Sequence, residues 1–162
     1  MDRNEQRRKV IKAGGGIGLL GLLAAAGLLP AGEAFAQQQG WNSGAFAART
    51  FADAVKALGG APATENKGVQ FASPTPDIAE NGAVVPITVT SSIPKTESIA
   101  ILVEKNPNLL SAVFDIPAGT DPFVSTRVKL AESTDVYALV KADGKFHFLK
   151  KEIKVTLGGC GG

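Results

Sequence analysis

Short apolar or alternating segments, separated by turn residues about every ten positions, fill the second half of the chain. In residues 123–130, for example, Phe123, Ser125 and Arg127 alternate with Val124 and Thr126. This pattern is typical of antiparallel strands packed as a sandwich. The seven or so expected strands cover residues 68–72, 83–90, 98–104, 110–116, 123–130, 135–141 and 146–151, with a further alternating segment at 152–157. We therefore predict an all-β protein with an immunoglobulin-like antiparallel β-sandwich.

Local signals refine this prediction. Pro86 lacks a backbone N–H, so its strand is expected at a sheet edge or a bulge. The sequence of residues 142–145, with Asp143 followed by Gly144, predicts a hairpin turn. Upstream of the strands, an apolar stripe predicts one N-terminal helix over residues 44–58, capped by Ser43 and ended by the glycine pair at residues 59–60.

The first 36 residues have the layout of an export signal. Arg7 and Arg8 open a charged segment, residues 13–29 carry no charge, and residues 34–36 place small side chains before a cleavage site after Ala36. The paired arginines are typical of a twin-arginine signal, whose cargo crosses the membrane folded. The apolar run has 17 residues, which is short for a span of ~20 residues. We therefore expect a periplasmic protein without a membrane anchor after cleavage, with the folded body in residues 37–157.

The only cysteine, Cys160, lies between two glycine pairs at the end of the sequence. A structural cysteine is normally buried, whereas glycines offer nothing to pack against and leave the backbone free. We expect residues 158–162, namely Gly158, Gly159, Cys160, Gly161 and Gly162, to form a flexible arm with the thiol in water. The three residues from Leu157 to Cys160 reach roughly 10 Å.

Apart from the cysteine, the sequence offers few signals of a binding or catalytic site. The net charge is +2, and the 17 basic and 15 acidic residues leave 12 of each after subtraction of the five basic and three acidic residues in the leader. A neutral body with one Trp and one Tyr argues against a nucleic-acid surface. No spacing predicts a metal site, a cofactor or a catalytic residue. His147, the only histidine, is expected to be an ordinary strand residue, with a role as base for the thiol as the alternative.

The tail at residues 154–162 resembles the C-terminus of the SoxY family, the sulfur carriers of the thiosulfate-oxidising Sox system. Residues 78–86, 103–108 and 125–133 resemble that family as well, and with the leader the similarity covers nearly the whole chain. One departure is Leu109, where the family pattern has a second proline after the Asn-Pro-Asn turn of residues 106–108.

The resemblance implies an immunoglobulin-like fold and a heterodimer, or a higher assembly, with a SoxZ-like subunit that would be exported bound to this chain. It implies that Cys160 is the point of substrate attachment, and that Asn81 and Asn106 are turn residues. It also implies three transient partners that work on the attached group. These are a haem-c enzyme that couples thiosulfate to the cysteine, a di-manganese hydrolase that releases sulfate, and an enzyme that oxidises the remaining sulfane sulfur.

Three functions compete on the sequence. The first is a non-enzymatic covalent sulfur carrier, because a thiol on a slim arm can deliver an adduct into another protein's active site. The second is a periplasmic interaction module in which Cys160 only forms intermolecular disulfides. The third is a ubiquitin-like sulfur carrier that works through a thiocarboxylate on the terminal Gly162, against which the export signal and the cysteine weigh.

Overall fold

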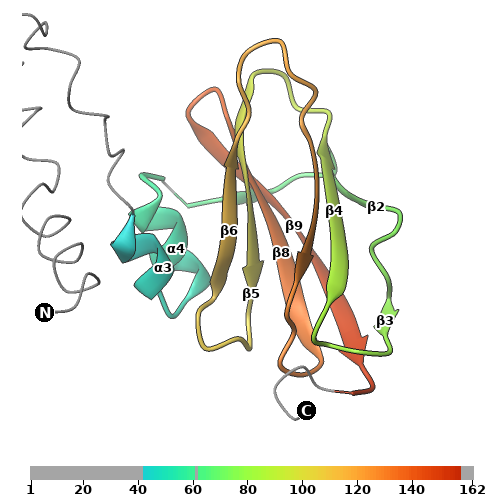
Figure 1. Ribbon diagram of the computed structural model, residues 1–162. Helices are drawn as coiled ribbons and strands as arrows, with labels where there is room; N and C mark the ends of the chain where they lie inside the picture. Colours follow the sequence, from blue (N-terminus) through green and yellow to red (C-terminus); the bar gives the residue numbers. More distant parts are fainter. Residues whose placement is uncertain (1–41, 61, 158–162) are drawn as a thin grey trace, which may run out of the picture. The chain divides into compact units, whose positions relative to one another are not determined.

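The computed structural model describes residues 42–60 and 62–157 (Figure 1). These residues belong to the second of two compact units, which spans residues 42–162. Two sheets face each other and two short helices lie beside one of them (Figure 1). The strands are β1 (Thr64–Glu65), β2 (Val69–Ala72), β3 (Ile78–Ala79), β4 (Val85–Ser91), β5 (Thr96–Val103), β6 (Leu110–Asp115), β7 (Phe123–Val128), β8 (Thr134–Ala142) and β9 (Lys145–Val155).

The larger sheet has six strands in the order β1-β9-β8-β5-β6, with β3 also paired to β9. The smaller sheet has three strands in the order β2-β4-β7. The pairs β2–β4, β4–β7, β5–β6, β5–β8 and β8–β9 are all antiparallel. The all-β, immunoglobulin-like sandwich expected from the strand spacing is therefore confirmed.

The predicted N-terminal helix is split in two, which corrects the expectation of one helix over residues 44–58. Helix α3 (Ser43–Ala47) is capped by Asn42 and not by Ser43 as expected, since the Asn42 side chain accepts a hydrogen bond from the Ala45 amide. Helix α4 (Phe51–Ala57) has its own cap, since Thr50 Oγ1 accepts from the Asp53 amide at 3.1 Å. Two good capping side chains eight residues apart thus favour two short helices over one.

The glycines after α4 serve two purposes. Gly59 has a φ of 85°, a left-handed conformation that ends the helix as predicted. Gly60 lies so close to β9 that an added Cβ would stand 2.6 Å from ring atoms of Phe146. The second glycine therefore allows the end of α4 to contact the sheet directly.

Strand β9 is one continuous strand of eleven residues, whereas the sequence suggested two segments that divide at residue 152. It pairs with β8 along its length, from Thr134 opposite Ile153 to Ala142 opposite Lys145. Two short strands, β1 and β3, pair with its other edge in parallel and were not predicted. The hairpin turn between β8 and β9 is confirmed, with φ values of 49° at Asp143 and 72° at Gly144.

Pro86 lies within β4, the middle strand of the smaller sheet. It stands opposite Arg127 of β7, while β2 on the other side pairs only from Thr88 onward. The Thr88 amide points away from β7, since it donates to Thr75 Oγ1 at 2.7 Å, and the nitrogen of Pro86 two residues earlier has the same direction. The expectation of an edge strand or a bulge is therefore wrong for β4 as a whole, and Pro86 is tolerated because its missing N–H faces a stretch of β4 that β2 does not pair.

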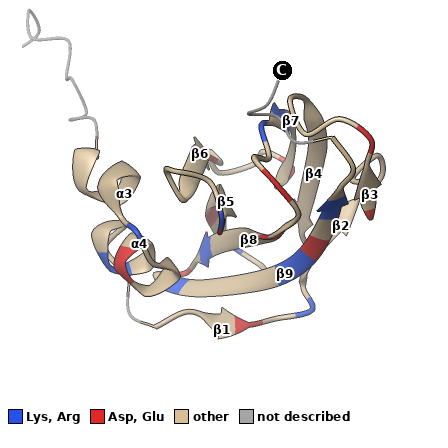
Figure 2. Cartoon of the chain, turned by 90° about the horizontal axis from the view of Figure 1, so that it is seen from below, with Lys and Arg blue, Asp and Glu red and all other residues tan. Residues whose placement is uncertain are grey.

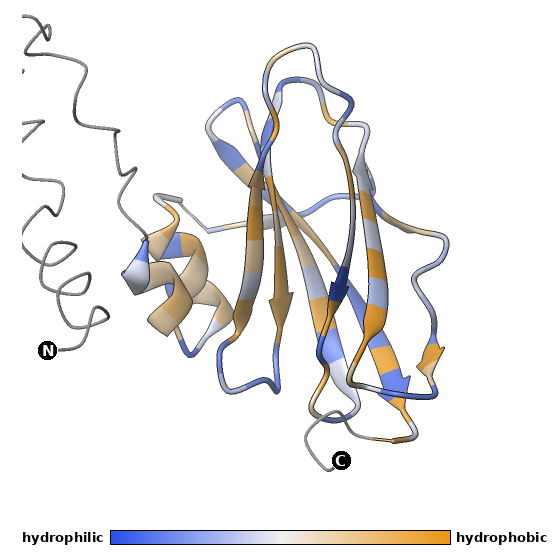
Figure 3. Cartoon of the chain, in the orientation of Figure 1, coloured by the Kyte–Doolittle hydropathy of each residue, from blue (hydrophilic) through white to orange (hydrophobic). Residues whose placement is uncertain are grey.

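Two apolar clusters hold the layers together. The first fills the space between the sheets and includes Ile87, Val89, Ile101 and Ile153, all fully buried. The second lies between the helices and the outer face of the larger sheet, and its members include Ala45, Ala54, Val55, Leu102 and Leu139. Figure 3 shows the alternation of apolar and polar stretches along β4 and β9 that a strand with two different faces requires. Among the described residues, no helix is long and apolar enough to cross a membrane.

Candidate functional site

The predicted attachment residue, Cys160, and the arm glycines Gly158, Gly159, Gly161 and Gly162 lie outside the described residues, as do Arg7, Arg8 and Ala36 of the leader. The structure describes the residues from which the arm starts. We call Val155, Thr156 and Leu157, with the residues that hold them, the arm base.

Ser133 fixes the last residue of β9. Its hydroxyl accepts a hydrogen bond from the Val155 amide at 2.9 Å and lies 3.4 Å from the Val155 carbonyl oxygen. Ser133 belongs to the turn between β7 and β8, so the end of β9 is tied to a turn as well as to its neighbouring strand. No sequence signal distinguished Ser133 from the other serines of the chain.

The segment around β3 holds the arm base from the other side. The Thr156 amide donates to the Ala79 carbonyl at 3.1 Å, and Thr156 Oγ1 donates to the Glu80 carbonyl at 3.0 Å. The Gly82 amide then donates to the Leu157 carbonyl at 2.7 Å. Each of the last three described residues is therefore hydrogen-bonded to another part of the fold.

Two asparagines organise the surrounding turns, as the resemblance implied. Asn81 Oδ1 accepts from the Ala83 amide at 2.8 Å and closes a local turn. Asn106, in the turn between β5 and β6, reaches further, because its Nδ2 donates to the Lys129 carbonyl at 2.7 Å and its Oδ1 accepts from the Ala131 amide at 3.1 Å. The turns at this end of the sandwich are thus bonded to one another.

The arm base has an apolar rim. Four large apolar side chains among the described residues are strongly exposed, and three of them belong to the arm base or to the segment that holds it: Ile78 at 58%, Val84 at 58% and Leu157 at 62%. Ile78 stands opposite Lys154 in the register of β3 and β9. The described part of the chain therefore ends in an apolar patch of its surface.

His147 cannot act as a base for a thiol on the arm. It lies in β9, opposite Thr64 of β1, and its Nδ1 is 3.4 Å from Asn66 Nδ2. Eight residues separate it from Val155, which is about 26 Å along a strand. The arm reaches roughly 10 Å from Leu157. His147 is a hydrogen-bonded strand residue, which confirms the first interpretation of the sequence.

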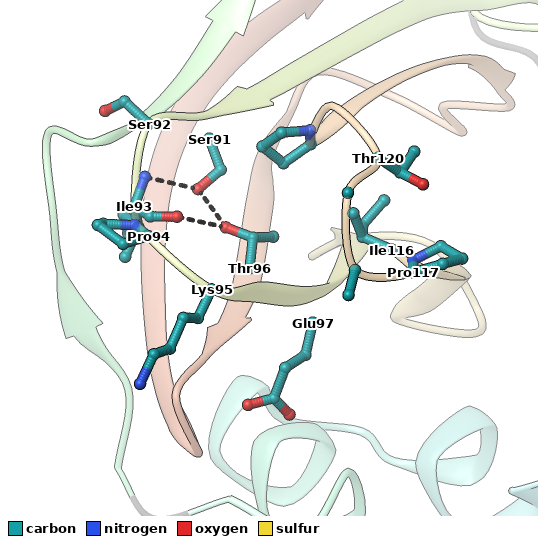
Figure 4. A pocket seen from close by; sticks show the side chains of 13 residues that line it. Ser91, Ser92, Ile93, Pro94, Lys95, Thr96, Glu97, Ile116, Pro117 and Thr120 are labelled. Atoms are coloured by element: carbon teal, nitrogen blue, oxygen red, sulfur yellow. Dashed lines mark hydrogen bonds between the residues drawn. The ribbon is translucent and has the colours of Figure 1, made fainter.

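A pocket of about 600 Å³ lies between the segment 91–97 and the loop after β6 (Figure 4). Two of its hydroxyl groups already have partners, since Ser91 Oγ is 2.9 Å from Thr96 Oγ1 and accepts from the Ile93 amide. Its residue Lys95 pairs with Asp143 at the tip of the β8–β9 hairpin, at 3.0 Å. That tip is the opposite end of β9 from the arm base, about 33 Å away, so the pocket lies beyond the reach of the arm.

The titratable groups with shifted pKa values lie in the larger sheet or in its hairpin turn, where they form ion pairs or pack against neighbouring side chains. A hydrogen bond from Lys141, and a second from the Gly144 amide, lower the pKa of Glu97. Lys95 lowers the pKa of Asp143, and Asp135 raises the pKa of Lys150 in the same way. Burial raises the pKa of Tyr137, whose ring stacks on Phe51. None of these four groups belongs to the arm base, and the described residues contain no cluster of metal-ligating side chains.

Comparison with known proteins points to one family. The family model described as "Sulfur oxidation protein SoxY" matches residues 55–160. A solved structure, the sulfur carrier protein SoxY from Chlorobium limicola f thiosulfatophilum, matches with 36% identity and a TM-score of 0.57. That match covers 64% of this chain and 92% of the other. No curated protein sequence matches the chain.

Two further solved structures match with 14% identity. One is an engineered protein, with a TM-score of 0.42 over 55% of this chain and 20% of the other. The other is a chain from a structure of T cell specificity and activation by the bacterial superantigen toxic shock syndrome toxin-1, with a TM-score of 0.39 over 54% of this chain and 97% of that chain. Similarity at this level carries no argument about function. The two SoxY matches agree with the resemblance seen in the tail and the middle segments.

Proposed function

Because the chain belongs to the SoxY family of sulfur oxidation proteins, whose members include a sulfur carrier, we propose that it is a periplasmic carrier that binds sulfur intermediates covalently through the thiol of Cys160. The family itself supports a carrier role in sulfur oxidation. The observation that supports the attachment point is that the family match extends to residue 160, and therefore includes the only cysteine.

The arrangement of the arm base suits this task. A carrier needs a fixed origin and a mobile end, so that one thiol can visit several active sites. The hydrogen bonds to Val155, Thr156 and Leu157 supply the fixed origin. The glycine-flanked cysteine follows within three residues. Because glycine has no Cβ, the backbone on either side of the cysteine is slim enough to enter a narrow cleft.

The proposed chemistry takes place on the thiol of Cys160. Loading joins the outer sulfur of thiosulfate to the thiol sulfur, with release of one proton and two electrons to the haem-c partner. The bound group is then a sulfonate at the end of a sulfur–sulfur chain. Hydrolysis by the di-manganese partner breaks the bond between the sulfonate and its neighbouring sulfur, adds one water, and releases sulfate and a proton. A persulfide remains on Cys160, and the sulfane-oxidising partner acts on it.

Membership of the family implies a partner from the same sulfur-oxidation system, such as a SoxZ-like subunit. We propose that this subunit forms a heterodimer with the described domain, and that the three enzymes bind it transiently. The proposed compartment rests on the leader, where Arg7 and Arg8 precede the apolar run and cleavage would follow Ala36. A twin-arginine route would export the folded heterodimer together.

The test is thiosulfate oxidation in a mixture reconstituted with the partner proteins. We expect Cys160→Ser to abolish turnover while the fold, by circular dichroism, and partner binding stay unchanged. A matched variant, Cys160→Ser with Leu157→Cys, places an exposed thiol at the arm base instead of on the arm. We expect this thiol to react with thiol-modifying reagents, and we expect the variant still to fail in thiosulfate oxidation.

Turnover by Cys160→Ser alone would refute the carrier function. If the variant with a thiol at Leu157 supports turnover as a cross-linked dimer, the protein is instead an interaction module that needs only a disulfide.

A further inference from the structure

A second pocket lies at the same end of the sandwich as the arm base. It has a volume of about 450 Å³ and lies between the turn after β5 and the end of β7. Asn106, Pro107 and Asn108 line one side, and Arg127 and Lys129 line the other. No acidic residue is among the residues that line it. We call it the basic pocket, and Figure 2 shows basic residues in the region of β7.

The cations around the basic pocket are not neutralised within the described domain. Five ion pairs join described residues, and neither Arg127 nor Lys129 takes part in any of them. Arg49 adds a third unpaired cation, because its Nη1 donates to the carbonyl oxygen of Pro107 at 2.6 Å. The nearby acid Glu132 is already paired with Lys105. Since the body carries equal numbers of basic and acidic residues, three unpaired cations in one place mark a local positive field.

A chain of hydrogen bonds connects the basic pocket to the arm base. Asn106 donates to the Lys129 carbonyl, the next amide, that of Leu130, donates to the Gly82 carbonyl at 2.7 Å, and the Gly82 amide donates to the Leu157 carbonyl. With standard backbone dimensions, these contacts place the Asn106 side-chain nitrogen no more than about 14 Å from the Leu157 carbonyl oxygen. The three residues to Cys160 reach roughly 10 Å. The two sulfur–sulfur bonds of a thiosulfate adduct add about 2 Å each.

We propose that the basic pocket binds a tetrahedral sulfur oxyanion, either a free sulfate or thiosulfate ion or the sulfonate end of the adduct on Cys160. A guanidinium offers a fork of donors that matches two oxygens, an ammonium adds a point charge, and the amide group of Asn108 can donate to a third oxygen. The adduct as a source rests on the proposed function, whereas the free ions do not.

Such a pocket would bind the arm when Cys160 carries a thiosulfate adduct and would not bind it when Cys160 carries a persulfide. A thiosulfate adduct ends in three oxygens that these donors can hold. A persulfide has none of those oxygens, so hydrolysis of the adduct removes the group that the pocket recognises. The pocket thus makes the position of the arm depend on whether sulfate has been released.

The first experiment titrates sulfate, then thiosulfate, into the full chain carrying Cys160→Ser, with the side-chain resonances of Asn108 and Arg127 followed by nuclear magnetic resonance. We expect saturable changes in chemical shift that are confined to residues of the basic pocket. The affinity that they report should fall as salt is added, because salt screens the attraction between the anion and the cations. Combined Arg127→Gln and Lys129→Gln should raise the dissociation constant about tenfold.

The matched control is Lys67→Gln, which removes an exposed cation beside β2, whose first residue, Val69, pairs with Ser91 at the far end of β4. It should leave the dissociation constant unchanged. Shifts spread over the whole surface, or equal affinity in the double variant and the parent, would overturn the proposal.

The second experiment distinguishes the two sources. Tetrathionate converts the thiol to the adduct, because the Cys160 thiolate attacks an inner sulfur, a new sulfur–sulfur bond forms, and thiosulfate leaves with the electron pair of the broken bond. If the arm supplies the oxyanion, the loaded chain shifts the same resonances without free ion and binds added sulfate more weakly. If the loaded chain binds sulfate as the Cys160→Ser chain does, the adduct is refuted as an occupant. Intact mass reports loading of Cys160 in either case, so failure of the pocket and failure of the carrier function are separable.

Discussion

Substitution of Ser133 by Ala tests whether the fold anchors the origin of the arm. The change removes the hydroxyl that accepts from the Val155 amide at 2.9 Å and leaves that amide without a protein partner. A lost hydrogen bond of this kind costs about 1–3 kcal/mol when the orphaned group is buried. Val155 is partly exposed, so water can replace some of the contact, and we expect a loss of about 1 kcal/mol.

The effect should be local and measurable by amide hydrogen exchange. The amides of Lys154 and Thr156 keep their own acceptors, the carbonyls of Asp77 and Ala79, in the variant. If Ser133 holds the end of β9, these two amides should exchange about fivefold faster, because 1 kcal/mol corresponds to that ratio. Amides in the middle of β9 should be unchanged.

Ser98→Ala is the matched control, because Ser98 is equally half-buried and its hydroxyl makes no hydrogen bond within the described part of the chain. It should not alter exchange at Lys154 or Thr156. Ser133 does not hold the end of β9 if Ser133→Ala leaves these two amides fully protected, or if both serine variants raise their exchange rates alike.

Three further predictions concern the scaffold. Gly60→Ala should lower the free energy of unfolding by about 1–3 kcal/mol in denaturant titrations, because the new Cβ would overlap the Phe146 ring; an unchanged midpoint would contradict this close contact. Ile153→Ala should cost about 2–5 kcal/mol in the same assay, because the side chain is fully buried between the sheets. The pKa of Glu97 is lowered from 4.5 by Lys141, so its contribution to stability is present above that pH and is lost as the pH falls through the lower folded value. Glu97→Gln should therefore destabilise the domain at pH 7, and this effect should shrink as the pH falls through the lowered pKa of Glu97; an effect independent of pH would contradict the assigned cause.

The sequence predicted the sandwich because alternation along a strand is a local property. Val124 and Val128 of β7 are buried and Phe123 and Arg127 are exposed, as their positions in the alternation required. The turn at Asp143 and Gly144 was equally readable, since few residue pairs adopt positive φ at two successive positions.

Features that depend on distant contacts were not readable in this way. The helix division depends on whether Asn42 and Thr50 both find an amide to cap, and the local apolar stripe gave no sign of it. The parallel pairing of β1 and β3 with β9 joins residues far apart in the chain through only two residues each.

The arm base illustrates the same limit at the functional site. Cys160 was recognisable because a lone cysteine among glycines is chemically unusual. Ser133 and Gly82 are common residues in turns, and only the fold brings them to Val155 and Leu157. Leu109 departs from the family pattern, yet its side chain is buried and its carbonyl accepts from the Val103 amide at 2.7 Å, which closes the β5–β6 hairpin.

The most direct test of the carrier function is the intact mass of the protein purified from its native host during growth on thiosulfate, followed by fragmentation to locate each added mass. If Cys160 carries the sulfur intermediates, we expect a mixture of free thiol and adducts with the masses of sulfur atoms and of sulfonate-bearing groups, all on Cys160. A single species with a free thiol, a disulfide-linked dimer, or an added sulfur on Gly162 would contradict the carrier function.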